Sequence, residues 1–396
     1  MPFRLRGGAG DGAAAMGGIE SGAWRQGIAI ERLEVAPQRR ILVTSDVHGH
    51  LAHLKSVLAQ AHFGGDDLLV IAGDLLEKGP EVLATLRYAM ELGRTHAVIC
   101  LAGNVDLSRV QLLEVTDPAH HGDIYAHLQR LRHWPSNLFD EMAAEMGVVL
   151  RSPADFTLYR EAMLARFEPE LNFLRSMPAI LETQRFIFVH GGLPTPNLVE
   201  LVGRDVYDVL AYPLFYNIEQ RFDKYVVVGH MPVMLYDGQI PQHNPLIDHR
   251  RRIISLDGGC GLKEDGQLNL LILPNIDCRA GEISWVHYDG LPVYEALTAQ
   301  AASPDSVNIR WGDLGVRVLE PGTEYTLVEH VSSGRRLWAE NAYLTPEGTA
   351  LRGDYTDYRL PVRPGDELSL VRSTDRGHFV KRNGVAGWYR GELRRK

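Results

Sequence analysis

Short, continuous apolar runs alternate with amphipathic segments in the first part of the chain. The apolar run in "RRILVTSDVHG" precedes a segment with apolar residues at helical spacing, Leu51, Leu54, Val57 and Leu58. A second run at 68–72 precedes a helical pattern from about residue 81, and "THAVICLAGNVD" contains a third run. Strands that are apolar on both faces and separated by helices are typical of α/β proteins.

Residues 106–182 have a different pattern, rich in Leu, Met, Glu and His, which predicts several helices. Apolar runs return at 185–194, 224–233 and 251–262, and two further runs follow them. We therefore expect an α/β domain over residues 36–300. We expect residues 106–182 to form a helical cap insertion that restricts the size of the substrate.

The two ends of the chain differ from this domain. Residues 1–35 are rich in Gly and Ala and predict a disordered tail. Residues 305–396 contain short strands and turns, and predict a small all-β module that folds independently. Two similar stretches in this module are spaced by 43 residues, as Pro321 and Pro364 show. One duplicated β-module and two small β-barrels are both compatible with this repeat.

Composition limits the functions that the chain can have. The net charge of −9 makes nucleic acid an unlikely partner, because phosphate contacts require a basic surface. The three cysteines form no CxxC pair, which favours buried thiols in a reducing compartment. No apolar stretch has the length of a membrane span. We therefore expect a cytoplasmic protein with no membrane partner.

Polar residues of metal-binding type follow the predicted strands, where the carboxyl ends of strands share one edge of a sheet. They are Asp46, His48, Asp74, Asn104, His190 and His230. Each residue alone has an ordinary alternative as a helix cap, a turn residue or a core histidine. Together they suit two divalent metal ions, with Mn²⁺ expected and Fe or Zn²⁺ as alternatives, and Asp74 is the best candidate for a bridge.

The ordered motifs "SDVHG", "GDLLEKG", "GNVD", "VHGG" and "GHM" resemble those of the calcineurin-like metallophosphoesterases over about residues 40–290. The similarity is to the branch shared by phosphoprotein phosphatases and bacterial phosphoesterases. It implies an α-β-β-α double-sheet sandwich that hydrolyses phosphate esters with a metal-activated hydroxide. It places Asp46 and His48 on the first metal ion, Asp74 between the two ions, and Asn104, His190 and His230 on the second. It gives Asp46, Asp74 and Asn104 catalytic roles.

Two departures from the family pattern affect the expected chemistry. Val105 replaces the histidine that donates a proton to the leaving group in "GNH[ED]". Glu77 and Lys78 replace the Asp and Arg of "GDxVDRG", and Lys lacks the bidentate fork of Arg. We therefore predict a preference for phosphodiesters or activated esters, whose leaving groups need the least help from an acid. Asn104, Lys78 and Glu77 are the predicted substrate-binding residues, although Glu77 and Lys78 are also compatible with a simple helix start before Pro80.

Other residues are candidates for supporting roles. Asp106 and Asp257 are expected behind the metal ligands, with an ordinary Asp-Gly turn as the alternative for Asp257. The C-terminal module resembles an SH3-like barrel, in which Trp388 and Tyr389 either line a groove for a protein or glycan ligand or fill a small core.

Two further functions stay open on sequence grounds. One is a protein phosphatase acting on a phosphoprotein, and the other is a binding scaffold of low activity. Metal content distinguishes the scaffold from the enzymes. The relative rates on aryl diesters and monoesters distinguish the two enzymes.

Overall fold

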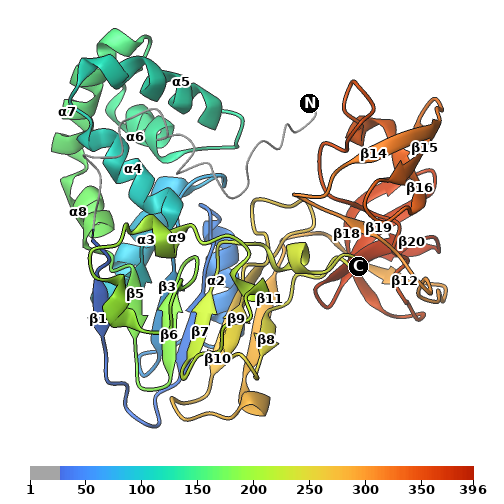
Figure 1. The fold of residues 1–396 in the computed structure, drawn as a ribbon, viewed down its shortest axis with the longest axis horizontal. Coiled ribbons are helices and arrows are strands. Elements are labelled where there is room, and N and C mark those ends of the chain that lie inside the picture. The colour runs from blue at the N-terminus through green and yellow to red at the C-terminus, as the bar shows by residue number, and fades with distance from the viewer. Residues whose placement is uncertain (1–26) are drawn as a thin grey trace. The chain divides into compact units, whose positions relative to one another are not determined.

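The computed structural model describes residues 27–396, which form two compact units (Figure 1). One unit contains residues 27–232 and 245–288, and the other contains residues 233–244 and 289–396. In the described part of the chain, no helix combines the length and the apolar character needed to cross a bilayer.

The larger unit is built on two mixed sheets. The strand order of the six-stranded sheet is β1 (Ile30–Arg32), β5 (Ile180–Glu182), β6 (Phe186–Val189), β7 (Tyr225–Val228), β9 (Ile253–Ser255) and β8 (Leu246–Asp248). The order of the five-stranded sheet is β11 (Ser284–Tyr288), β10 (Leu268–Leu273), β2 (Ile41–Thr44), β3 (Leu68–Ala72) and β4 (Ala97–Leu101). Within them, β2, β3 and β4 run parallel, as do β6, β7 and β9.

The two sheets pack face to face, and side chains alternate between two apolar clusters along each strand. Ile41 and Val43 of β2 share one cluster with Phe188 of β6, between the sheets. Leu42 and Val189 point the other way, into the cluster that includes the helices. This alternation explains the continuous apolar runs of the sequence, because these strands are covered on both faces.

Helices cover the outer faces of the sandwich (Figure 1). Helix α2 (Leu51–Gln60) packs on β10 and β11, and α3 (Val82–Thr95) packs on β4. The insertion contains α4 (Asn104–Glu114), η1 (Pro118–His120), α5 (His121–Leu131), α6 (Leu138–Met146), η2 (Pro153–Asp155), α7 (Phe156–Arg166) and α8 (Glu168–Ser176). The remaining short helices of this unit are η3 (Leu198–Leu201), α9 (Tyr207–Leu210), η4 (Phe215–Asn217) and η6 (Ala280–Glu282). The expected α-β-β-α sandwich with a helical insertion is confirmed.

The predicted tail over residues 1–35 needs a correction within its described portion. Residues 30–32 form β1, which pairs in parallel with β5, and Leu33 donates its backbone N–H to the carbonyl oxygen of Glu182 at 3.0 Å. The edge of the six-stranded sheet orders this segment because it offers unpaired backbone groups. Residues 1–26 lie outside the described residues.

The second unit is β-rich, as expected. A five-stranded sheet has the order β20 (Val385–Tyr389), β19 (Gly377–Arg382), β18 (Glu367–Thr374), β12 (Val293–Ala296) and β21 (Leu393–Arg395). Two further sheets contain β14 (Val316–Glu320), β15 (Tyr325–His330) and β16 (Arg336–Glu340), and β13 (Asn308–Ile309) with β17 (Tyr355–Thr356). The 3₁₀ helices η5 (Val233–Tyr236) and η7 (Asn341–Tyr343) belong to the same unit. The pairs between named strands are antiparallel, and the SH3-like assignment stays a prediction.

The boundary of this unit differs from the predicted break between residues 300 and 305. Strand β12 lies inside the five-stranded sheet, between β18 and β21. The segment 233–244 also belongs here, because Asn308 donates its side-chain N–H groups to the carbonyl oxygens of Met234 at 3.0 Å and Asp237 at 2.8 Å. The linker-like composition after residue 297 could not reveal these long-range contacts.

Candidate metal centre

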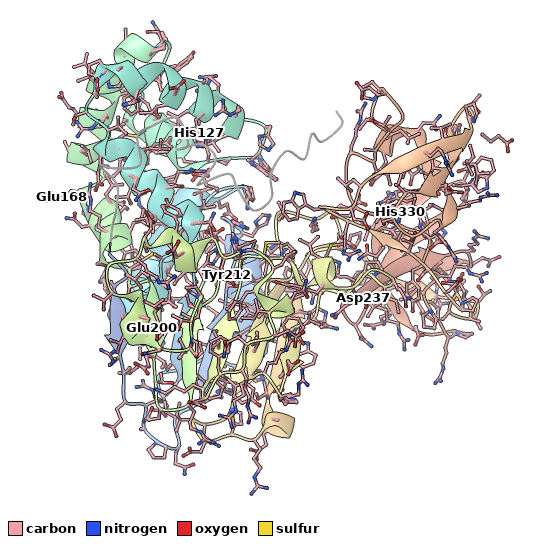
Figure 2. All side chains as sticks on the ribbon, in the orientation of Figure 1. His127, Glu168, Glu200, Tyr212, Asp237 and His330 are labelled. Carbon is pink, nitrogen blue, oxygen red and sulfur yellow. The ribbon has the colours of Figure 1, made fainter. Side chains whose placement is uncertain are left out.

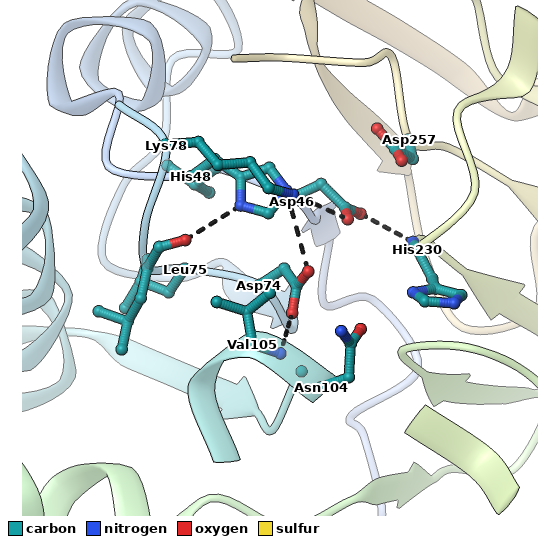
Figure 3. A network of polar contacts seen from close by, with 12 residues as sticks. Asp46, His48, Asp74, Leu75, Lys78, Asn104, Val105, His230 and Asp257 are labelled. Atoms are coloured by element: carbon teal, nitrogen blue, oxygen red, sulfur yellow. Dashed lines mark hydrogen bonds and ion pairs between the residues drawn. The ribbon is translucent and has the colours of Figure 1, made fainter. Parts of the chain in front are cut away.

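The structure brings the six predicted ligands together at one edge of the sandwich. Figure 3 shows Asp46, His48, Asp74, Asn104 and His230. Each one lies at or shortly after the carboxyl end of an apolar strand of the parallel parts of the sheets. They come from the loops after β2, β3, β4, β6 and β7: Asp46, His48, Asp74, Asn104, His190 and His230.

Asp46, His48 and Asp74 form the first group of potential ligands. All three are buried, and each offers a ligand atom within 4.8 Å of those of the others. Nδ1 of His48 lies 3.0 Å from the carbonyl oxygen of Leu76, which makes Nδ1 the protonated nitrogen. Nε2 then presents its lone pair toward the two carboxylates, at 3.9 Å from Asp46 and 3.8 Å from Asp74. A backbone carbonyl that orients a histidine in this way is typical of a metal ligand.

Asn104, His190 and His230 surround the other side of Asp74. Nδ1 of His190 donates to the carbonyl oxygen of Ala72 at 2.9 Å, so Nε2 points into the site. There it lies 3.0 Å from Oδ1 of Asn104 and 3.4 Å from Oδ1 of Asp74. The rings of His190 and His230 are 5.1 Å apart, centroid to centroid.

This donor set fits a divalent metal ion. Nε2 of His230 is buried and has no hydrogen-bond partner among residues 27–396, so a buried lone pair is available for a ligand bond. Carboxylate, amide and imidazole groups are the ligands that Mn²⁺, Fe and Zn²⁺ accept.

Backbone strain is concentrated at the same residues. Asp46, His48, Asp74 and His230 all adopt the left-handed region, with φ between 49° and 69°. Non-glycine residues rarely adopt this conformation, and it gathers at functional sites where the surrounding structure compels it.

Neighbouring glycines allow the loops to approach one another. A Cβ at Gly103 would lie 2.2 Å from Oδ1 of Asp74, and a Cβ at Gly229 would lie 2.2 Å from Oδ2 of Asp46. The Gly that precedes Asn104 and the Gly that precedes His230 are therefore required by close packing around the carboxylates.

The electrostatics of the centre favour a bound cation. Burial raises the pKa of Asp46 well above its usual value, and the nearby Asp257 carboxylate raises it further. Burial also acts to raise the pKa of Asp74, but His190, His48 and Lys78 together hold it below its usual value. Burial tends to lower the pKa of His190, yet Asp74 and Asp46 raise it to about 10. A positive charge is thus favoured at the point where Nε2 of His190 faces Oδ1 of Asn104 and Oδ1 of Asp74.

Asp106 joins two of the ligand loops. Its carboxylate accepts the backbone N–H of Gly103 at 3.1 Å, of Leu75 at 3.2 Å and of Leu76 at 3.0 Å. It therefore ties the start of α4 to the loop that carries Asp74.

Asp257 is also buried near the centre, on the side of Asp46 and His230 (Figure 3). Its carboxylate accepts a local hydrogen bond from the backbone N–H of Gly259 at 2.7 Å. This bond forms the Asp-Gly turn that was the alternative for Asp257. The carboxylate also raises the pKa of Asp46.

Lys78 lies at the centre itself. Its Nζ is 2.9 Å from Nε2 of His48, and it faces the ring of Trp134 at 6.0 Å from the ring centroid. Trp134 comes from the helical insertion, so the insertion contributes directly to the surroundings of the predicted phosphate-binding lysine.

Glu77 makes contacts that the sequence did not suggest. Its Oε1 accepts a 2.8 Å bond from Nε of Arg109, and both side chains are at most 2% exposed. Nη1 of Arg109 in turn lies 3.4 Å from Nε2 of His127, in the helical insertion (Figure 2). The missed signal is that Arg109 lies one helical turn after Val105, on the same side of α4.

Val105 lies beside Asn104 in the first turn of α4 and is 3% exposed. Its backbone N–H donates to Oδ1 of Asp74 at 3.0 Å (Figure 3). An aliphatic side chain therefore stands directly next to the potential ligands, and it has no proton to donate.

Comparison with known proteins agrees with this geometry. A family model described as calcineurin-like phosphoesterase matches residues 39–234. The symmetrical bis(5'-nucleosyl)-tetraphosphatase of Vibrio cholerae serotype O1 is 30% identical over 257 residues, which cover 55% of this chain and 90% of that protein. The protein of the same name from Hamiltonella defensa is 44% identical over 63 residues, 16% of this chain and 22% of that protein.

Among solved structures, a cold-active protein-tyrosine phosphatase of a psychrophilic Shewanella is 16% identical to this chain. The match covers 62% of this chain and 78% of that one, with a TM-score of 0.41.

Proposed function

This chain belongs to the calcineurin-like phosphoesterase family, and we propose that it acts on phosphoric esters and anhydrides whose leaving group departs as a stable anion. The family makes it a hydrolase of phosphoric ester bonds. We further propose dinucleoside polyphosphates as the substrate class, since breaking such a chain releases a nucleotide anion.

Val105 is the observation that carries this proposal. A general acid contributes about 10²–10⁴-fold to a reaction whose leaving group must be protonated. Val105 cannot supply that proton, although it lies beside Asn104 and contacts Asp74 through its backbone. Such a site is suited to leaving groups that need no proton, such as a nitrophenolate or a nucleoside phosphate.

The metal ligands of the proposal are the six residues at the sheet edge. Asp46 and His48 would hold one divalent ion, Asp74 would bridge, and Asn104, His190 and His230 would hold the second. Two such ions neutralise phosphoryl oxygens and lower the pKa of water toward neutrality.

The remaining chemistry belongs to side chains around these ligands. We assign the binding of phosphoryl oxygens to the Asn104 amide and the Lys78 ammonium, because Asn104 contacts His190 and Lys78 contacts His48, on the two sides of Asp74. Asp106 holds the Asp74 loop and the start of α4 in register through three backbone N–H groups. The insertion supplies Trp134, whose ring faces Lys78, and Arg109, which holds Glu77.

The names of the relatives support the substrate class. Both the Vibrio and the Hamiltonella protein are named as symmetrical tetraphosphatases of bis(5'-nucleosyl) compounds. A polyphosphate chain between two nucleosides is also the substrate type that the missing acid favours.

The test compares three substrates at equal metal occupancy with the full chain. We expect kcat/KM for diadenosine tetraphosphate and for bis-nitrophenyl phosphate to exceed kcat/KM for an alkyl phosphate monoester. Elemental analysis should find two Mn²⁺, Fe or Zn²⁺ ions per chain. If a phosphoserine peptide or an alkyl monoester is the best substrate, the chain is a monoesterase of the protein-phosphatase type and the proposal is wrong.

A further inference from the structure

A hollow of about 440 Å³ lies within the β-rich unit, between β16, β17 and the end of β20. We call it the arginine groove, because arginines at positions 335, 336, 359, 376 and 390 line it. Its volume is within the range of small-molecule sites. All of its lining residues lie between 303 and 390, so the site is contained in one unit.

Aromatic rings form part of the groove wall. Trp338 is 39% exposed, which is unusual for so large an apolar side chain. The indole of Trp388 is held in place by a 2.8 Å bond from its Nε1 to the carbonyl oxygen of Thr356, and it is partly exposed. Tyr389, next to it, is fully buried and fills the core, so of the two predicted groove residues only Trp388 lines the hollow.

The arginines of the groove differ in what they contact. Arg335 is ion-paired at 2.7 Å with both Asp305 and Asp357, the two carboxylates that line the hollow. Arg336 is paired with Glu329. Within the described residues, by contrast, Arg359, Arg376 and Arg390 have no carboxylate partner.

Arg376 is held by aromatic rings instead of by an acid. Its guanidinium carbon lies 4.3 Å from the ring centroid of Tyr325 and 4.7 Å from that of Trp338. Stacking fixes the plane of the guanidinium while leaving its N–H groups available to an anion.

We propose that the arginine groove binds a nucleoside phosphate. The guanidinium groups of Arg359, Arg376 and Arg390 are not paired with a carboxylate of the described residues, and their N–H groups match the paired oxygens of a phosphate. The part of the Trp338 indole that stays exposed beside Arg376 offers a stacking surface to a nucleobase. This site is separate from the metal centre and does not depend on the proposed function.

Two other anionic occupants fit less well. A long nucleic acid requires an extended basic surface, whereas the chain has a net charge of −9 and residues 305–396 have 15 Lys and Arg against 13 Asp and Glu. An acidic peptide would use the arginines but would gain little from the exposed indole of Trp338.

The experiment measures binding of ADP to the full chain in EDTA, by titration calorimetry and by quenching of tryptophan fluorescence. Arg390→Glu and Trp338→Ala should each weaken ADP binding about tenfold or more. Trp338→Ala should also remove most of the quenching. Adenosine and inorganic pyrophosphate should each bind more weakly than ADP, because each lacks one half of the ligand.

Arg363→Glu is the matched control, because Arg363 is exposed in the same unit, does not line the groove and changes the net charge equally. It should alter ADP affinity less than about twofold. Hydrolysis of bis-nitrophenyl phosphate by metal-loaded Arg390→Glu should equal that of the wild type. If either groove variant melts at a lower temperature, Arg390→Gln and Trp338→Phe should show intermediate affinity.

Three results would overturn the assignment. The first is no ADP binding by the metal-free wild type at millimolar concentration. The second is binding that Asp74→Asn abolishes and Arg390→Glu leaves intact, which would place ADP in the metal centre. The third is displacement of ADP by a poly-glutamate peptide or a dT oligonucleotide that binds more tightly through the same two residues.

Discussion

Val105 donates its backbone N–H to Oδ1 of Asp74 at 3.0 Å, so the residue that lacks an acidic proton also helps to hold the proposed bridging ligand. The bond comes from the first turn of α4, where backbone N–H groups have no partner inside the helix. It does not depend on the side chain at position 105. A substitution there can therefore change the chemistry while leaving the support of Asp74 in place.

Val105→His should raise the activity on alkyl phosphate monoesters relative to diesters. The new imidazole would stand beside Asn104, and a monoester's leaving alkoxide gains most from a proton. We expect a change of at most about 10²-fold in the ratio of kcat/KM values, the low end for a general acid. One reason is that Arg109 already binds Oε1 of Glu77, so that in the described part of the chain only Oε2 is left to orient the new imidazole. A ratio that stays constant at equal metal occupancy would show that position 105 is not the acid's position.

Asp74→Asn should remove most of the activity and much of the bound metal. The substitution keeps the shape of the side chain but removes the charge that faces His48 and His190. Elemental analysis and hydrolysis of bis-nitrophenyl phosphate, measured on protein loaded with Mn²⁺, check both effects. Full turnover with two retained ions would contradict the proposed bridge.

Arg109→Met should lower the free energy of unfolding by about 3–5 kcal/mol, because it leaves the Glu77 carboxylate buried without its partner. Arg94→Met is the control, since Arg94 pairs with Glu91 on the surface and is 76% exposed. Loss of that pair should cost about 0–1 kcal/mol. Urea unfolding of both variants measures the difference, and adding Glu77→Gln to Arg109→Met should restore part of the loss.

His127→Gln should flatten the decline in stability at acid pH. Burial, together with the charges of Arg109 and Arg130, lowers the pKa of His127 to about 3. The unfolded chain protonates this residue below about pH 6.5. The stability that the folded state gains from keeping His127 neutral is therefore fully present above pH 6.5 and is lost as the pH falls toward 3. The Gln carbonyl keeps an acceptor for Arg109 and does not titrate.

The measurement for His127 is the free energy of urea unfolding between pH 7 and pH 4. The stability of the wild type should approach or fall below that of His127→Gln as the pH falls. The exposed His133 provides the control substitution, His133→Gln. Parallel curves for wild type and His127→Gln would contradict the prediction.

A fragment of residues 289–396 should be more stable than one of residues 305–396. The shorter fragment lacks β12, which lies between β18 and β21, and it lacks the fully buried Ala296. It also lacks Gln300, whose side chain donates to the carbonyl oxygens of Leu360 and Trp388 at 2.7 Å. Thermal unfolding followed by circular dichroism should show a lower midpoint for the shorter fragment. Equal midpoints would support the boundary near residue 305 instead.

Local pattern predicted the buried strands of an α/β domain and the candidate ligands that follow them, and the family resemblance implied the double-sheet sandwich. Strands covered on both faces must be apolar along their whole length, so 68–72 and its counterparts stand out in the sequence. Polar residues placed directly after such runs, such as Asp74, share one sheet edge because parallel strands end there together. The sequence also shows a glycine, Gly103, directly before Asn104. The structure explains why it is a glycine, because a Cβ there would collide with Asp74.

Tertiary packing alone decided which partners those residues have. Glu77 and Arg109 are 32 positions apart, and the sequence does not indicate that the loop after β3 meets α4 at this point. The β-rich unit recruits residues 233–244 through backbone oxygens, which every sequence offers equally. In the arginine groove, Arg376 stacks on rings from β15 and β16. Arg335 forms ion pairs with both lining carboxylates, Asp305 and Asp357. A pairing of this kind depends on which segments meet in space, and a sequence pattern carries that information only where the spacing is local.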